Sequence, residues 1–269
     1  MAFGIIIIGD EILSGKRTDK HLAKFIELLT ARGLQLGWAE YIGDDPDRIT
    51  ATLKRTFASN DVVFSCGGIG ATPDDHTRLC AARALGVDLV LHPEAQKKIN
   101  ERIADVAREA GKEPNYSAED NIHRLKMGEF PAGAEIIPNS FNKIPGFSIT
   151  HATGGAHYFV PGFPVMAEPM MNWVLDTHYA HLFHQHAYVE KSVFVYESME
   201  STLTPLMETI ETAFPNVKVF SLPSVGDAQR RRHIELGVKG DPAQCEQAYD
   251  SMLAGLDKLK QEYVAIASK

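Results

Sequence analysis

The segment 65–77 is the part of the sequence best suited to bind a ligand, because its run SCGGIGATPDDHT combines three glycines with two carboxylates. Gly67, Gly68 and Gly70 follow a short apolar run and precede a segment with helical spacing, so we predict a turn from a strand into a helix. Glycine lets the backbone approach an anion closely, and the first N–H groups of a helix carry the positive end of its dipole. The pattern predicts a phosphate-binding loop; the alternative is a glycine-rich turn that only redirects the chain.

The two commonest phosphate-binding loops match this segment poorly. A P-loop ends in Gly-Lys-Ser or Gly-Lys-Thr, and no lysine follows Gly70. The dinucleotide fingerprint has a third glycine where Pro73 stands, and it normally follows the first strand of its domain rather than the third. The loop therefore belongs to another class.

Carboxylates follow three of the predicted strands. Asp10 and Glu11 come after the first strand, Asp44 after the second, and Asp74 and Asp75 after the third. The carboxyl ends of parallel strands meet at one edge of a sheet, where ligands of such folds bind. Acids near a phosphate repel it unless a divalent cation bridges them or one of them exchanges protons. Each acid alone is explained by a helix cap, but together they favour a metal–phosphate site.

These residues are positioned by strand-like and helix-like segments that alternate along the chain. Such alternation is typical of an α/β domain with a doubly wound, mostly parallel sheet. The predicted strands are 3–8, 34–42, 62–65, 135–137 and 158–160, and the predicted helices are 18–31, one within 43–57, one from 73–75 to Gly86, helical segments between 93 and 133, and one behind Pro164.

A change of pattern divides the chain into two predicted domains. The first spans 1–176, and the segment 177–186 has no clean period and is taken as the linker. The second domain, 187–269, is a small α+β unit in the order βαββα, which we interpret as an interaction or dimerisation module. Its elements are strands at 188–196, 217–222 and 234–239 and helices at 201–214 and 242–263.

Composition excludes several classes of protein. Thirty-five acidic against 27 basic residues give a formal net charge of −8, so neither nucleic acid nor an anionic membrane is an expected partner. The apolar run Ile5–Ile8 is far too short to span a membrane, and no secretory signal precedes it. Three scattered cysteines are too few for a disulfide framework. We expect a cytoplasmic globular protein.

Four motifs occur in the order that one known superfamily shows. The runs GDEILSGK, GDDPDRI, CGGIGATPDDHT and VPGFPVMAEPM together resemble the molybdopterin-binding-domain (MoaB/MogA-like) superfamily. The closest resemblance is to the N-terminal region of the competence- and damage-inducible CinA proteins, and to the related first domain of eukaryotic FAD synthases. It extends from the first strand to about Val174 and implies a three-layer α/β domain.

The resemblance implies two functions. CinA-like domains are similar to divalent-metal-dependent pyrophosphatases that split a nucleotide such as ADP-ribose or FAD at its diphosphate and release AMP. Related proteins bind molybdopterin in molybdenum cofactor synthesis without such hydrolysis. The implied cofactor is Mg²⁺, Mn²⁺ or Co²⁺, the ligand is a nucleotide or pterin phosphate, and the assembly is a homo-oligomer, a dimer. A purely structural role with a degenerate site is a third hypothesis.

The resemblance also implies which residues form the site. Asp75 and Asp44 are expected to be catalytic and, with Glu11, to hold the metal. The remaining expected site residues are the phosphate-binding Gly67, Gly68, Gly70, Thr77, Gly15 and Gly162, and the further pocket acids Asp10, Asp74 and Glu168.

The sequence departs from the superfamily pattern at three positions. Cys66 replaces the usual threonine, Ala71 stands where CinA-like sequences tend to have proline, and His76 replaces an apolar residue. These changes affect the expected substrate preference more than phosphate binding. Because the sequence ends at Lys269, we expect this polypeptide to lack the C-terminal CinA amidohydrolase domain, and with it deamidation of nicotinamide mononucleotide.

Overall fold

The computed structural model describes residues 1–185, 189–226 and 231–266 of the chain. The chain divides into two compact units, Met1–Phe183 and His184–Lys269. The division falls inside the predicted linker 177–186, although helix α7 (Pro164–His178) and a 3-10 turn at Ala180–Leu182 carry the first unit into that segment. The predicted start of the second domain, at 187, lies outside the described residues.

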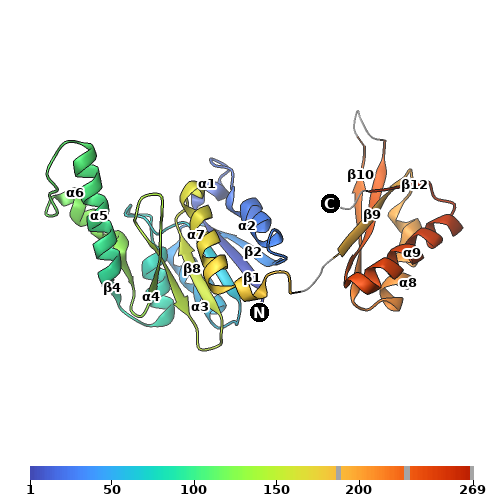
Figure 1. The fold of residues 1–269 in the computed structure, drawn as a ribbon, viewed down its shortest axis with the longest axis horizontal. Helices are drawn as coiled ribbons and strands as arrows, with labels where there is room; N and C mark the ends of the chain where they lie inside the picture. The colour runs from blue at the N-terminus through green and yellow to red at the C-terminus, as the bar shows by residue number, and fades with distance from the viewer. Residues whose placement is uncertain (186–188, 227–230, 267–269) are drawn as a thin grey trace. The chain divides into compact units, whose positions relative to one another are not determined.

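The first unit is built on a six-stranded sheet that is mostly parallel (Figure 1). Four strands run parallel to one another, and the last two, at one edge, pair antiparallel. This confirms the predicted fold class, whereas β7 was not predicted. The strands, in spatial order, are β2 (Leu36–Ile42), β1 (Phe3–Ile8), β3 (Val62–Cys66), β8 (Ala156–Val160), β7 (Gly146–Thr150) and β6 (Glu135–Ile137).

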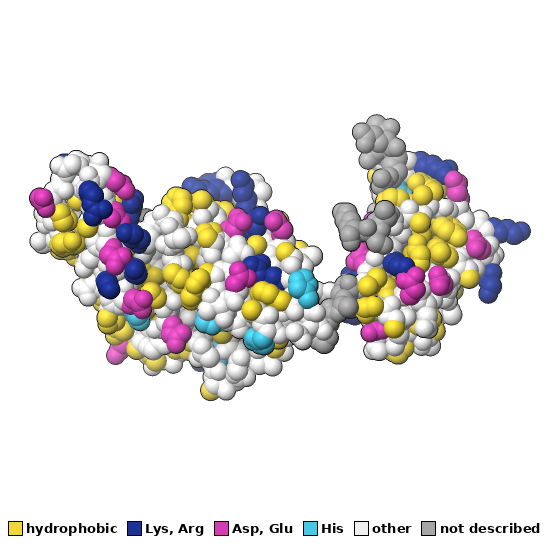
Figure 2. All heavy atoms as spheres, in the orientation of Figure 1, with side chains coloured by type: hydrophobic (Ala, Val, Ile, Leu, Met, Phe, Trp, Pro, Cys, Tyr) yellow, Lys and Arg dark blue, Asp and Glu magenta, His cyan; other side chains and the backbone are white. Residues whose placement is uncertain are grey.

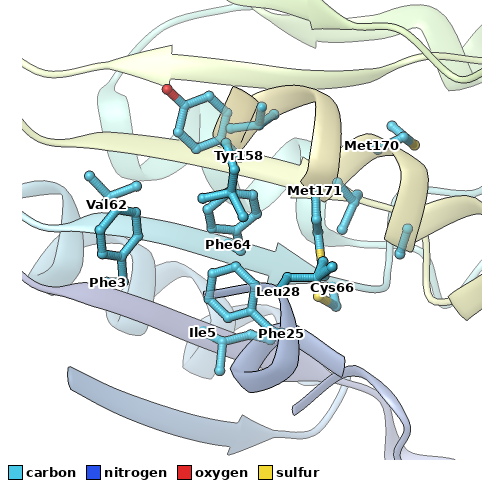
Figure 3. Close-up of a cluster of buried hydrophobic side chains, with 14 of the residues drawn as sticks. Phe3, Ile5, Phe25, Leu28, Val62, Phe64, Cys66, Tyr158, Met170 and Met171 are labelled. Carbon is cyan, nitrogen blue, oxygen red and sulfur yellow. The ribbon is translucent and has the colours of Figure 1, made fainter. Parts of the chain in front are cut away.

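Helices cover both faces of this sheet, which explains why β1 is buried along its whole length. Alternate residues of β1 enter different cores: Ile5 packs in one cluster with Phe25, and Ile6 packs in the other with Leu53. Figure 3 shows the first cluster, where the rings of Phe25 and Phe64 have centroids 4.6 Å apart. The covering helices are α2 (His21–Thr30) and α7 on one face, and α3 (Pro46–Phe57) and α4 (Thr77–Leu85) on the other.

Helix α4 begins at Thr77, later than the predicted start at Pro73 to Asp75. The intervening residues form tight turns, in which the Asp75 N–H donates to the Thr72 carbonyl oxygen at 3.1 Å and the His76 N–H donates to that of Asp74 at 3.0 Å. Asp74 and Asp75 therefore belong to the loop before the helix and are not its first turn.

An excursion between α4 and β6 carries its own small elements. It consists of β4 (Leu89–Leu91), α5 (Pro93–Glu109), α6 (Glu119–Leu125) and β5 (Glu129–Pro131), with β4 and β5 paired antiparallel. Its helical character agrees with the prediction, but the two short strands were not predicted. Basic and acidic side chains are interspersed along α5 (Figure 2), as in the ion pair of Lys98 with Glu101 at 3.2 Å, so this helix presents a mixed surface and not a basic stripe.

The second unit is an antiparallel four-stranded sheet with two helices, and its strand order is β10-β11-β9-β12. The predicted order βαββα is present, followed by one further strand, which gives the split βαβ arrangement. The last helix ends at Lys258 and not at 263, because Lys260 adopts a positive φ of 54° that a helix does not tolerate. The elements are β9 (Val189–Tyr196), α8 (Glu200–Ala213), β10 (Val217–Ser224), β11 (His233–Gly240), α9 (Pro242–Lys258) and β12 (Tyr263–Ala265).

None of the helices described in 1–185, 189–226 and 231–266 is long and apolar enough to cross a membrane.

Candidate functional site

A pocket of about 570 Å³ lies at the carboxyl ends of the parallel strands in the first unit. The chain enters its wall directly after β1, β2, β3 and β8, which is where open α/β sheets bind ligands. Residues at these strand ends that line it are Gly9, Glu11, Asp44, Gly67, Gly68, Gly70, Asp74, Asp75, Pro161 and Gly162. The sheet thus brings together acids and glycines that are far apart in sequence.

The glycine loop is packed so closely that side chains are excluded from it. A Cβ on Gly67 would overlap the carbonyl oxygen of Ile8, and one on Gly68 would overlap Oγ1 of Thr77. Both glycines also have positive φ values, 107° and 67°, that disfavour other residues. The backbone conformation and the close packing at these two positions require glycine.

Thr77 anchors this loop and does not line the pocket. Its side chain is fully buried; its Oγ1 donates to the Gly67 carbonyl oxygen at 3.0 Å, and its N–H donates to that of Gly68 at 3.0 Å. The hydroxyl that was expected to contact phosphate is thus committed to the protein backbone.

The N–H groups of the loop are left for a ligand. In the described part of the chain, the backbone N–H groups of Gly68, Ile69, Gly70 and Ala71 donate no hydrogen bond to the protein. Since Gly68, Ile69, Gly70 and Ala71 all line the pocket, their N–H groups are candidate donors to a bound anion.

Asp75 is held against the glycine loop. Its Oδ2 accepts from the Thr72 N–H at 2.8 Å and from the Thr72 hydroxyl, and a Cβ on Gly70 would come within 2.5 Å of the same oxygen. Its other oxygen, Oδ1, accepts no hydrogen bond from the described residues. The carboxylate is therefore oriented by one oxygen and open at the other.

Asp44 is oriented by Asp10 in a similar way. Its Oδ2 accepts from the Asp10 N–H at 2.9 Å, and the Asp10 Oδ1 accepts from the Asp44 N–H at 3.2 Å. Burial raises the pKa of the Asp44 carboxyl, and the negative charges of Asp10, Glu11 and Asp74 raise it further. These acids crowd one another, so a cation in the pocket would relieve their repulsion.

Arg78 was not predicted from the sequence as a site residue, yet its side chain holds the glycine loop through a hydrogen bond. The residue is 7% exposed, and its guanidinium donates to the carbonyl oxygens of Gly70 at 2.6 Å and of Lys126. Burial lowers its pKa. Lys126 directly precedes the pocket residue Met127, so Arg78 links two segments that line the pocket, the glycine loop and the segment at Met127.

The expected site residues divide into two sets. Eight of them line the pocket: Glu11, Asp44, Gly67, Gly68, Gly70, Asp74, Asp75 and Gly162. Four do not: Asp10 supports Asp44, Gly15 forms a turn, Thr77 is buried, and Glu168 lies on α7 with a carboxylate oxygen 3.6 Å from the Lys24 ammonium.

Several pocket residues were not predicted: most lie in loops without a motif pointing to a ligand, and Phe163 and Met166 lie in the motif VPGFPVMAEPM but were not singled out within it. Most of them are apolar, and Arg17 is the one cation among the described residues that line the pocket. Besides Arg17, the residues not predicted include Met127, Asn139, Asn142, Ile144, Pro145, Phe163 and Met166. Phe163 is 55% exposed although it is aromatic.

The carboxylates of the pocket are better suited to a metal ion that is also coordinated by a ligand than to one coordinated by protein side chains alone. Within the described ranges, no group of three or more His, Cys, Asp or Glu side chains is placed to hold a metal ion. Mg²⁺ and similar hard cations are commonly bound by one or two carboxylates together with phosphate oxygens and water. The oxygens of Asp44 and Asp75 match that chemistry.

Cys66, one of the departures from the superfamily pattern, is a packing residue. It is buried in the core shown in Figure 3, and burial raises the pKa of its thiol, so it is an inert side chain under ordinary conditions.

Comparison with known proteins assigns the family. Residues 4–181 match the family model described as "Probable molybdopterin binding domain". The chain belongs to this molybdopterin-binding domain family. Since the matched residues include the strands and loops that form the pocket, the pocket lies within the family domain.

Curated relatives and a solved structure refine this assignment. A CinA-like protein of Anaeromyxobacter sp. (strain K) is 33% identical over 176 residues, 65% of this chain and 40% of the relative, so the chain spans well under half of that protein's length in the match. A protein of Pyrobaculum calidifontis is 29% identical over 220 residues, 81% of this chain and 79% of that protein. The structure of CinA from Thermoplasma acidophilum, whose function is described as unknown, is 26% identical with a TM-score of 0.55, covering 65% of this chain and 96% of that one. The resemblance to the N-terminal CinA region is confirmed.

Proposed function

We propose that this protein hydrolyses the diphosphate of a nucleotide such as ADP-ribose or FAD, with a divalent cation, and releases AMP. The observation that carries the proposal is that Asp44 and Asp75 line the same pocket as a loop with four uncommitted N–H donors, at Gly68, Ile69, Gly70 and Ala71. Candidate donors for phosphate and candidate ligands for a cation therefore line one pocket.

The chain's own residues perform the positioning. The loop N–H groups hold the phosphate oxygens and neutralise part of their charge as the reaction proceeds. The divalent cation, when bound, screens the phosphate and polarises the attacking water. Asp44 and Asp75 hold that cation or orient the water, each with one oxygen anchored to the protein.

Hydrolysis at this pocket is a simple displacement. The water oxygen forms a bond to one phosphorus, the bond from that phosphorus to the bridging oxygen breaks, and the water proton passes to a carboxylate. AMP and a second phosphate ester leave the pocket. The apolar side chains that line the pocket, such as Met127, Phe163 and Met166, are suited to contact the ring system of the nucleotide.

A second function is favoured by the apolar side chains of the pocket and by the family. Met127, Phe163 and Met166 border a space beside the anion-binding loop, which suits a pterin carrying a phosphate. In this alternative the protein binds molybdopterin without cleaving it. It predicts binding with no phosphate-ester product.

Charge-neutral substitutions of the two acids test the hydrolase. We expect Asp75→Asn and Asp44→Asn to reduce AMP release from ADP-ribose by about a hundredfold or more with Mn²⁺ present, as for loss of a group acting in the transition state. Asp47→Asn is the matched control, since Asp47 is an exposed residue of α3 outside the pocket. Undiminished AMP release by both pocket variants would remove these acids from the mechanism.

A further inference from the structure

A single basic side chain lines the acidic pocket in the described part of the chain. Arg17 shares the pocket wall with Glu11, Asp44, Asp74 and Asp75. Four carboxylates and one guanidinium leave the pocket strongly negative, although the proposed ligand is an anion. The position of the one cation therefore matters for binding.

The turn after the short helix α1 (Asp10–Leu13) brings Arg17 to this wall. The Gly15 N–H donates to the Ile12 carbonyl oxygen at 3.1 Å, and Gly15 has a φ of 72°, which reverses the chain. The Arg17 N–H then donates to the Glu11 carbonyl oxygen at 2.9 Å. Gly15, expected to bind phosphate, instead forms the turn that returns Arg17 to the pocket.

The guanidinium of Arg17 is not committed to the protein. Across the described residues it donates no hydrogen bond and forms no ion pair, even though four acids line the same pocket. Arg32 behaves differently, because its guanidinium binds Asp176 at 2.7 Å and Asn172 at 2.8 Å. An uncommitted guanidinium that lines the same pocket as uncommitted backbone N–H groups is suited to a phosphate, which it binds through two parallel hydrogen bonds.

We propose that Arg17 binds a phosphate group of the ligand together with the N–H groups of the glycine loop. The inference uses the pocket and the phosphate-bearing ligand of the proposed function but does not depend on hydrolysis. It follows that part of the affinity for a nucleotide diphosphate persists without divalent cation, because one positive charge is supplied by the chain.

Calorimetric titration of ADP-ribose in buffer containing EDTA tests this directly. We expect Arg17→Met to weaken binding about ten- to a hundredfold, the range for a lost charged hydrogen bond. Arg17→Lys keeps the charge without the planar fork, so its loss is smaller. The matched control is Lys16→Met, because Lys16 is a neighbouring exposed cation that does not line the pocket, and its affinity should stay near that of the wild type.

Three results would overturn the proposal. They are no binding of ADP-ribose by the wild type in EDTA, unchanged affinity in Arg17→Met, and equal weakening in Arg17→Met and Lys16→Met, which would indicate only general surface charge. Arg17 is exposed, so the variant should unfold at the wild-type temperature. Arg17-dependent binding without AMP release would reject the hydrolase alone; AMP release with an unchanged KM in Arg17→Met would reject the role of Arg17 alone.

Discussion

Replacing Thr77 with valine should loosen the glycine loop without removing a ligand contact. The Oγ1 of Thr77 donates to the buried carbonyl oxygen of Gly67, and valine has nearly the same shape but no hydroxyl. The hydrogen bond from the residue 77 N–H to the Gly68 carbonyl oxygen is retained. The loop therefore loses one of its three hydrogen bonds to α4, because the Arg78 guanidinium also still donates to the Gly70 carbonyl oxygen.

The magnitude follows from the burial of the two groups. A buried backbone acceptor that loses its donor costs about 1–3 kcal/mol of unfolding free energy. For a unit the size of Met1–Phe183, each kcal/mol corresponds to about 2–4 °C of unfolding temperature, so we expect a decrease of roughly 2–12 °C. The KM for ADP-ribose should rise several-fold, because the N–H donors are held less firmly.

Thermal unfolding and steady-state kinetics of the same preparation measure the expected changes in unfolding temperature and in the KM for ADP-ribose. Thr77→Ser keeps the hydroxyl and loses one methyl group, so it should lose about 1 kcal/mol of stability yet retain the wild-type KM. If Thr77→Val instead unfolds at the wild-type temperature while ADP-ribose binding is lost, the hydroxyl contacts the phosphate itself and the anchoring role is wrong.

Two further predictions concern a ring contact and the response to acid. Phe163→Ala should raise the KM for FAD about two- to tenfold, the range for one aromatic contact, with little change in unfolding temperature because Phe163 is more than half exposed; an unchanged KM would exclude it from the ring-binding wall. Burial lowers the pKa of His157, whose Nδ1 lies 2.9 Å from the His151 Nε2, well below its usual range near 6.5. The unfolded chain then binds a proton that the folded chain does not, so stability should fall as the pH drops below about 6.5, by up to about 1.4 kcal/mol per pH unit for this group. Denaturant unfolding between pH 5 and 7.5 measures this, and a His157→Asn variant with the same slope as the wild type would contradict it.

The edge of the sheet at which the candidate site lies could be predicted from the sequence. Each crossover helix returns the chain to the same starting edge, so the carboxyl ends of the parallel strands all lie at the other edge. Asp44 and Asp75 were placed together on that argument, and both line the pocket. The same argument put Asp10 at this edge, where its carboxylate accepts from the Asp44 N–H and does not line the pocket. A position just after a parallel strand indicates at which edge of the sheet a residue lies, but not which way its side chain turns.

Contacts between distant segments could not be predicted in this way. Arg78 donates to the carbonyl oxygen of Lys126, 48 residues away. The segment between them folds back toward α4, and no local sequence pattern predicts that path. The positive φ of Gly15 determines where Arg17 lies, and glycine alone does not specify which turn it forms. Thr77 closed the expected motif, but only the loop geometry shows that its hydroxyl faces inward.

Product analysis most directly tests our proposal that this pocket cleaves a nucleotide diphosphate. Purified protein incubated with ADP-ribose, with and without Mn²⁺, should release AMP and ribose 5-phosphate in equal amounts only when the metal is present. FAD should give AMP and FMN in the same way. Binding of either nucleotide with no AMP formed under any divalent metal would contradict the hydrolase and favour the pterin-binding alternative.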